Sequence, residues 1–223
     1  MKGIFQMQTN QDYINYYEKV LKTNNYNTIQ MYFKNNNCVN HKIVGHMTYL
    51  CRQSKAKEFL EWVKYYDTTP YAKNISIAVG KLQEALRENK VECTDEVVTI
   101  CLKAFLLYQT WIGVEQEKAA MKLLADKNFY CLYPQSDIDL FHNIDIILVS
   151  RSRKKWVAGI QVKPSSFYEM ESDRYRTAKF QKRYHLPTMN IRYDRYKKDF
   201  YDVDIENIQL YKRQLLRYEK SEQ

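Results

Sequence analysis

The sequence has 223 residues, with 35 Lys and Arg against 26 Asp and Glu, which gives a formal net charge of +9. A hydrophobic share of 45% supplies a core and excludes a mainly disordered chain, and only 5 Gly and 4 Pro exclude collagen-like and linker-rich proteins. We expect no signal peptide and no membrane-spanning segment, and therefore a cytoplasmic protein. Its five cysteines, an odd number, indicate reduced thiols.

The first 127 residues are predicted to be mostly helical. Apolar residues recur three and four positions apart there, which is the spacing of an amphipathic helix. Thr94 is a plausible N-cap, because its hydroxyl can accept a hydrogen bond from the first turn of the helix that follows. The predicted helices cover residues 12–21, 55–66, 76–88, 95–108 and 111–126.

After Lys127 the pattern changes to short runs of β-branched and aromatic residues bounded by turns, which are typical of strands. A turn over residues 150–155 would join the second and third strands into an antiparallel hairpin, and residues 172–184 are predicted to be a helix. The sequence therefore predicts an α+β fold with a mostly helical N-terminal region. The predicted strands cover residues 129–132, 144–149, 156–162 and 188–193.

The positive charge is concentrated in one block. Residues 151–198 carry a net charge of +10, whereas residues 1–150 carry only +1. Aromatic rings are interleaved with the basic residues, at Trp156, Phe167, Tyr168, Tyr175, Tyr184, Tyr193 and Tyr196. Such a block indicates a nucleic-acid-binding surface, although a solvated basic face would give the same count. The candidate DNA-binding residues are Arg151, Arg153, Lys154, Lys155, Arg174, Arg176, Lys179, Lys182 and Arg183.

The predicted hairpin also holds the residues best suited to catalysis. Asp145 opens the second strand, and alternation along the third strand places Gln161 and Lys163 on one face. Asp145 and the side-chain oxygen of Gln161 could hold a hard divalent cation, while Lys163 could orient the attacking water and offset negative charge. This combination fits metal-assisted hydrolysis of a phosphodiester.

A third metal ligand is expected from the preceding helix. Glu117 shares the packed face of that helix with Ala120 and Leu124, whereas Glu115 lies with more polar neighbours. A buried carboxylate is costly unless it is compensated, for example by a cation. Glu117 is therefore the first candidate, and Glu115 is the reserve.

Three further residues near the hairpin have two interpretations each. Asp137 and Asp139 could replace Asp145, although loop residues that cap a turn after Pro134 are the favoured interpretation. His142 could assist proton transfer, although a turn histidine with satisfied hydrogen bonds is favoured.

The order of a helix glutamate, an aspartate before an apolar strand, and Gln-x-Lys at the end of the next strand resembles the core of the PD-(D/E)XK nucleases. The resemblance covers roughly residues 111–193. The segment Gly-Ile-Gln-Val-Lys-Pro-Ser-Ser-Phe over residues 159–167, together with the helical N-terminal region, is most similar to the MjaI-type type II restriction endonucleases.

This resemblance implies a restriction-endonuclease-like core, with a mixed sheet flanked by helices, over residues 111–223. It implies that residues 1–110 supply DNA contacts or dimerisation, and that the protein is a homodimer cutting double-stranded DNA at a short site with Mg²⁺, for which Mn²⁺ can substitute. Two departures are evident. Gln161 replaces the usual acidic residue, as in Mrr-like nucleases, and no proline directly precedes Asp145.

A zinc site is a competing interpretation of the N-terminal region. Cys38, His41, His46 and Cys51 have the spacing of a zinc knuckle, but the apolar residues between them favour a packed element with buried thiols, so we do not expect zinc. The alternatives to a restriction enzyme are an Mrr-like or junction-resolving nuclease of the same core, and a non-catalytic nucleic-acid-binding protein.

Overall fold

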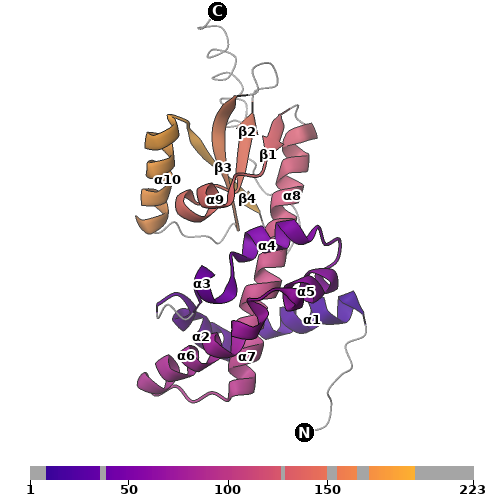
Figure 1. The fold of residues 1–223 in the computed structure, drawn as a ribbon, viewed down its shortest axis with the longest axis vertical. Helices are drawn as coiled ribbons and strands as arrows, with labels where there is room; N and C mark the ends of the chain where they lie inside the picture. The colour runs from indigo at the N-terminus through magenta and orange to yellow at the C-terminus, as the bar shows by residue number, and fades with distance from the viewer. Residues whose placement is uncertain (1–8, 36–38, 127–128, 150–154, 165–170, 194–223) are drawn as a thin grey trace, which may run out of the picture. The chain divides into compact units, whose positions relative to one another are not determined.

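The computed structural model describes residues 9–35, 39–126, 129–149, 155–164 and 171–193. The chain divides into two compact units, residues 1–114 and residues 115–223, which are described separately. The ribbon in Figure 1 labels the α-helices and the strands of both units.

The described part of the first unit is helical, as the sequence predicts. A π-helical segment, η2, joins helices α7 and α8 into one continuous helical stretch. Helix α8 begins in the first unit and ends in the second. In chain order the elements are α1 (Asn10–Leu21), α2 (Asn24–Asn35), α3 (His41–Val44), α4 (Met47–Ser54), α5 (Phe59–Thr68), the 3-10 turn η1 (Ala72–Asn74), α6 (Ile75–Glu88), α7 (Asp95–Lys103), η2 (Ala104–Gln109) and α8 (Thr110–Asp126).

Helix α5 begins four residues later than the sequence predicts. Helix α4 ends at Ser54, and Lys55 then adopts a left-handed backbone conformation with a φ of 52°. The carboxylate of Glu61 accepts hydrogen bonds from the backbone N–H groups of Lys57 and Glu58, which fixes the new start. The apolar periodicity runs across this break and therefore does not reveal it.

Two buried hydrogen bonds from aromatic side chains fix the interior of the first unit. The indole of Trp62 donates to the carbonyl oxygen of Leu107 at 3.1 Å, inside the π-helical segment. The hydroxyl of Tyr66 donates to the carbonyl oxygen of Val44 at 3.1 Å. Because buried polar groups are costly without partners, these bonds allow both large rings to lie in the core.

The helical stretch over residues 95–126 is long and apolar enough to cross a membrane, by length and composition alone. Our expectation of no membrane-spanning segment stays a prediction. In the structure, apolar side chains of this stretch up to residue 114 lie in the core of the first unit, and Ala120 and Leu124 lie in that of the second. Those that are at most 2% exposed include Val98, Leu102, Leu106 and Leu107.

The second unit contains a mixed four-stranded sheet in the order β1-β2-β3-β4. Neighbouring strands are antiparallel from β1 to β3, while β3 and β4 are parallel and are connected through α10. The predicted α+β fold, with a mixed sheet and a helical N-terminal region, is confirmed. The elements are β1 (Tyr130–Leu132), α9 (Ser136–His142), β2 (Ile146–Val149), β3 (Trp156–Pro164), α10 (Glu171–Tyr184) and β4 (Thr188–Tyr193).

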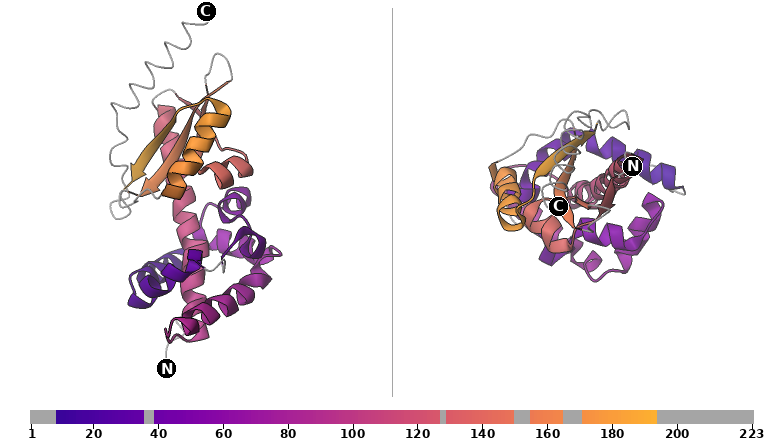
Figure 2. Two further views of the ribbon diagram at one scale, coloured as in Figure 1. Left: turned by 90° about the vertical axis from the view of Figure 1, so that its left-hand side faces the viewer. Right: turned by 90° about the horizontal axis from the view of Figure 1, so that it is seen from above.

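Helices cover both faces of this sheet. On one face, Ala120 and Leu124 of α8 pack with Ile146, Ile160 and other alternate strand residues. On the other face, α9 and α10 pack against Ile147 and Val149 through residues that include Phe180. The turned view in Figure 2 shows α10 in front of the strands and α8 behind them.

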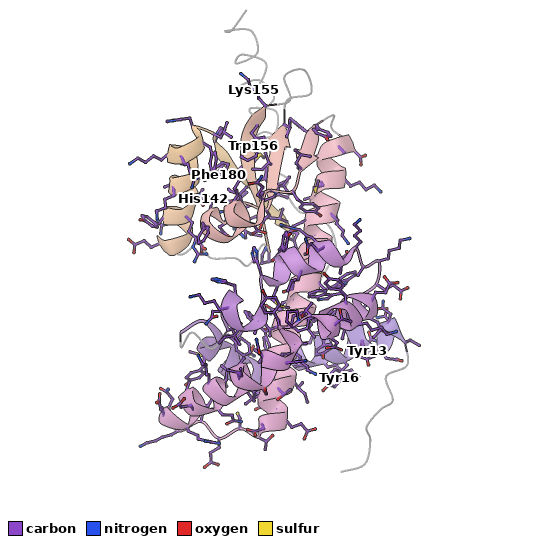
Figure 3. All side chains as sticks on the ribbon, in the orientation of Figure 1. Tyr13, Tyr16, His142, Lys155, Trp156 and Phe180 are labelled. Carbon is purple, nitrogen blue, oxygen red and sulfur yellow. The ribbon has the colours of Figure 1, made fainter. Side chains whose placement is uncertain are left out.

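The contact between α10 and β3 depends on a glycine. A Cβ at Gly159 would lie 2.8 Å from Cε1 of Phe180 and 3.0 Å from Cδ1 of Ile144, closer than side-chain atoms normally approach. Figure 3 shows Phe180 together with Trp156 and His142 between α10 and the strands. Gly159 therefore permits α10 to lie close to the face of β3 that also carries Gln161 and Lys163.

The segment between β1 and β2 is not the loop that the sequence predicts. Asp137 and Asp139 lie within helix α9, and His142 is its last residue. The helix ends because Asn143 adopts a left-handed conformation with a φ of 57°, which asparagine tolerates better than most residues. The prediction of turn residues at these three positions was wrong.

Candidate active site

Asp145 lies directly before β2 and is held by the backbone of β3. Its backbone N–H donates to the carbonyl oxygen of Ile160 at 2.8 Å. Its carboxylate oxygen Oδ2 accepts a hydrogen bond from the backbone N–H of Val162 at 2.7 Å. These two bonds fix the carboxylate beside the end of β3, where Gln161 and Lys163 lie.

Lys163 points to the same carboxylate. Its Nζ lies 3.4 Å from Oδ2 of Asp145, and the two side chains are only 14% and 11% exposed. Nζ also donates to Oδ1 of Asn143 at 3.1 Å. The ammonium is thus held between two oxygen acceptors, and in so sheltered a pair the attraction is stronger than on the open surface.

Gln161 is almost fully buried, at 1% exposed, and faces α10. Its side-chain nitrogen Nε2 donates to the hydroxyl of Thr177 at 2.9 Å. The oxygen Oε1 is at the other end of the amide. Gln161 and Lys163 alternate along β3 with Ile160 and Val162, which are buried on the α8 side of the sheet. Gln161 and Lys163 therefore share the opposite face, as the sequence predicts.

Three residues that the sequence interpretation did not select join this group. Asn143 contacts Lys163 through Oδ1, and its Nδ2 lies 3.4 Å from Oδ1 of Asp173. Thr177 contacts Gln161 and also donates to the backbone oxygen of Asp173 at 2.9 Å. Asp173 and Thr177 are polar residues on the same face of α10 as Phe180. Their helical spacing from this apolar residue was the signal in the sequence that could have identified them.

The helix carboxylates differ in the way the sequence predicts. Glu117 is buried, at 5% exposed, one turn before Ala120 on α8. Glu115 is partly exposed and pairs with Lys118, whose Nζ lies 2.7 Å from Oε1. Ala120 and Leu124 follow Glu117 on the same face of α8. They pack against the side of the sheet that is opposite to α10.

The site offers some of the oxygen ligands that a hard cation needs. Asp145 offers a carboxylate and Gln161 an amide oxygen, and Mg²⁺ prefers oxygen ligands while keeping several waters. Within the described ranges no three His, Cys, Asp or Glu side chains form a group that could hold a metal ion. The ligands of a cation here would therefore include, in addition to carboxylates, the amide oxygen of Gln161, water molecules and the substrate.

The zinc-knuckle residues do not form such a group either, as far as they can be placed. Cys38 lies outside the described residues. His41 begins α3 and is exposed, whereas Cys51 is buried on α4. Burial lowers the pKa of His46, and the neighbouring Arg52 and His41 lower it further.

Apart from Lys163, the basic side chains of the block over residues 151–198 that the structure describes lie in solvent. Helix α10 buries one face and exposes the rest, and its basic residues are on the exposed part. Lys155, directly before β3, is also exposed, as Figure 3 shows. Arg151, Arg153 and Lys154 lie outside the described residues. The exposed residues of α10 are Arg174, Arg176, Lys179, Lys182 and Arg183.

The aromatic rings of this block are mostly not available to a ligand. Tyr193 is 4% exposed and belongs to the core of the second unit, so its interpretation as a nucleic-acid contact was wrong. Trp156 and Tyr184 pack between α10 and the sheet. Tyr175, at 61% exposed, lies on the open face of α10, where the ammonium of Lys179 is 4.5 Å from its ring centre. Phe167, Tyr168 and Tyr196 lie outside the described residues.

His142 is buried beside these rings, and its Nδ1 has no hydrogen-bond partner among the described residues. Its ring centre lies 6.0 Å from that of Phe180 and 5.8 Å from that of Tyr184. The expectation of a histidine with satisfied hydrogen bonds was therefore wrong, and its contacts are those of a core ring.

The family follows from a match over most of the sequence. A family model for the MjaI restriction endonuclease matches residues 27–210, which include Asp145, Gln161, Lys163 and α10. The chain belongs to the MjaI restriction endonuclease family. It is therefore a restriction endonuclease with DNA as its substrate, and the resemblance seen in the sequence is confirmed. Comparisons with curated proteins and with solved structures gave no match.

Proposed function

We propose that the protein is a type II restriction endonuclease, which hydrolyses both strands of DNA at a short specific sequence in a Mg²⁺-dependent reaction. One observation carries the proposal. In a chain of a restriction endonuclease family, the carboxylate of Asp145 lies beside the ammonium of Lys163 where β2 begins and β3 ends, and Gln161 is on the same face of β3 as Lys163. These are a cation-binding oxygen pair and a positive charge beside it.

Asp145 and Gln161 are proposed to hold the cation. Oδ2 of Asp145 accepts from Val162 and Lys163, which fixes the position of the carboxylate that would bind the cation. The side chain of Gln161 contributes Oε1. Buried Glu117 is proposed as the third protein ligand, and it would reach the cation from α8, on the other side of the sheet from α10. Bound Mg²⁺ would supply a Lewis acid for the phosphate and lower the pKa of a bound water.

Lys163 is proposed to orient the attacking water and to offset negative charge on the phosphate in the transition state. Its ammonium is positioned by Asp145 and Asn143 before substrate arrives. Such preorganised charge needs little rearrangement during the reaction, which makes it effective in a sheltered site. Lys163 therefore acts on charge and geometry while Asp145 and Gln161 bind the cation.

The exposed basic face of α10 and the predicted basic turn over residues 150–155 are proposed to bind the DNA backbone. Phosphate contacts position a protein on DNA without reading its sequence, so base recognition needs additional side chains. The helical first unit is proposed to supply further DNA contacts or the dimer surface. A homodimer would match the symmetry of a palindromic site.

Digestion of phage-sized DNA tests this function. With Mg²⁺ the purified protein should give discrete fragments, and EDTA should abolish them. A smear would replace the type II assignment with a less specific nuclease of the same core. Binding to DNA without cleavage under either Mg²⁺ or Mn²⁺ would rule out catalysis.

A further inference from the structure

The side chain of Thr177 makes two hydrogen bonds whose directions depend on each other. Its Oγ1 lies 2.9 Å from the backbone oxygen of Asp173 and 2.9 Å from Nε2 of Gln161. A hydroxyl carries one hydrogen, and a backbone carbonyl oxygen can only accept. The Thr177 hydrogen is therefore used on Asp173, and its oxygen can only accept from Gln161.

This fixes which end of the Gln161 amide faces α10. The two ends of a glutamine amide have nearly the same shape, and only their hydrogen-bond partners distinguish them. An acceptor-only neighbour requires the nitrogen Nε2 to point toward Thr177. In the flipped amide, Oε1 would face the lone pairs of the Thr177 oxygen unless the hydroxyl gave up its hydrogen bond to Asp173.

We propose that Thr177 is a positioning residue that holds the amide of Gln161 with its oxygen Oε1 directed away from α10, toward the cation. The proposal rests on the proposed function, since it concerns the ligand role of Gln161. Because Gln161 is 1% exposed, water cannot readily replace the hydroxyl of Thr177 as the partner of Nε2. Thr177 thereby makes an amide a reliable oxygen ligand where a nuclease of this kind usually has a carboxylate.

The same geometry makes a carboxylate at position 161 a poor fit. Gln161→Glu would place an acceptor against Thr177, whose hydroxyl would have to leave Asp173 to donate to it. Thr177 and Gln161 therefore form a matched pair. The cost of Gln161→Glu should be smaller in a chain that already carries Thr177→Val, since the hydrogen bond from Nε2 of Gln161 to Thr177 is already lost there.

Binding of Mn²⁺ to the full-length protein, measured from the electron paramagnetic resonance signal of free Mn²⁺, tests the proposal without cleavage. Thr177→Val keeps the shape of the side chain and should weaken Mn²⁺ binding by about tenfold, the scale of one lost hydrogen bond. Thr177→Ser keeps the hydroxyl and should bind as the wild type does. Thr177→Ala is the second variant if Thr177→Val does not fold.

The matched control is Thr188→Val. Thr188 accepts from Nε2 of Gln181 at 2.7 Å, a bond of the same kind on the exposed side of α10. This variant should bind Mn²⁺ with unchanged affinity. Equal Mn²⁺ affinities of the wild type and Thr177→Val would overturn the positioning role while leaving the nuclease intact.

A double-mutant cycle in thermal unfolding gives an independent result. Gln161→Glu should lower the melting temperature of the Thr177→Val variant by less than it lowers that of the wild type. Equal decreases would contradict the matched pair. A wild type that neither binds Mn²⁺ nor cleaves DNA would instead refute the proposed function, so the two failures are distinguishable.

Discussion

The ammonium of Lys163 lies 3.4 Å from carboxylate oxygen Oδ2 of Asp145, and both side chains are largely buried. Their backbones belong to neighbouring segments of an antiparallel pair, so the sheet itself brings them together. Removing one member of a buried ion pair leaves the other charge uncompensated. The pair therefore links the stability of this end of the sheet to the proposed chemistry.

Asp145→Asn should abolish cleavage, and it should also lower the stability of the fold because buried Lys163 loses its ion-pair partner. Asparagine can still accept the Val162 hydrogen bond, but it loses the charge that attracts a cation and Lys163. We expect cleavage to fall by about 100-fold or more, a loss typical of a removed electrostatic contact in an active site. Single-turnover cleavage measures this. A variant that cleaves at the wild-type rate would exclude Asp145 as a ligand.

Gly159→Ala should destabilise the protein. The added Cβ would meet Phe180 at 2.8 Å, and overpacking of this kind typically costs about 1–3 kcal/mol. Gly80→Ala is the matched control, because Gly80 lies in helix α6 and a Cβ added there would meet no atom within 4 Å, so Ala should stabilise by up to about 1 kcal/mol. Denaturant unfolding measures both. Equal effects would contradict close packing of α10 on β3.

Lys182→Ala should weaken DNA binding at any sequence. Each lost phosphate contact should reduce the slope of log affinity against log salt by about 1. Lys122→Ala is the control, since Lys122 is exposed on α8, which covers the other face of the sheet. Fluorescence anisotropy at several salt concentrations gives the slopes. An unchanged slope for Lys182→Ala would exclude this part of α10 from the interface.

Two thiols should make the protein less stable at high pH. Burial raises the pKa of Cys131 to about 11, and burial together with Cys93 raises the pKa of Cys101 to about 11. A raised pKa in the folded state means that folding favours the protonated thiol, so this stability is present below about pH 9 and is lost as the pH rises toward 11. Unfolding free energies measured across this range should fall, and should fall less for Cys131→Ala. Identical pH profiles would show that Cys131 does not contribute.

The hairpin could be predicted from the sequence because its signals are local. Alternation along residues 156–162 sets which side chains share a face, and the apolar runs on either side set the two strands. The positions of Asp145, Gln161 and Lys163 follow from this pattern and a nearby turn. Burial of Glu117 follows in the same way from the helical spacing that it shares with Ala120 and Leu124.

The supporting residues could not be predicted because they depend on tertiary packing. Thr177 is 16 residues from Gln161, and Asp173 is 30 residues from Asn143. Only the close approach of α10 to Gly159 brings them together. Tyr193 shows the opposite error: the sequence indicated a ring for DNA, whereas alternation along β4 places it in the core.

Cleavage by Lys163→Met tests the proposed active site most directly. Methionine keeps much of the apolar stem of lysine but has no charge, and Lys163 is not among the residues proposed to bind the DNA backbone. With Mg²⁺ and phage-sized DNA, the variant should bind DNA as tightly as the wild type yet give no discrete fragments. The same fragments at the wild-type rate would contradict the assignment of catalysis to Asp145, Gln161 and Lys163.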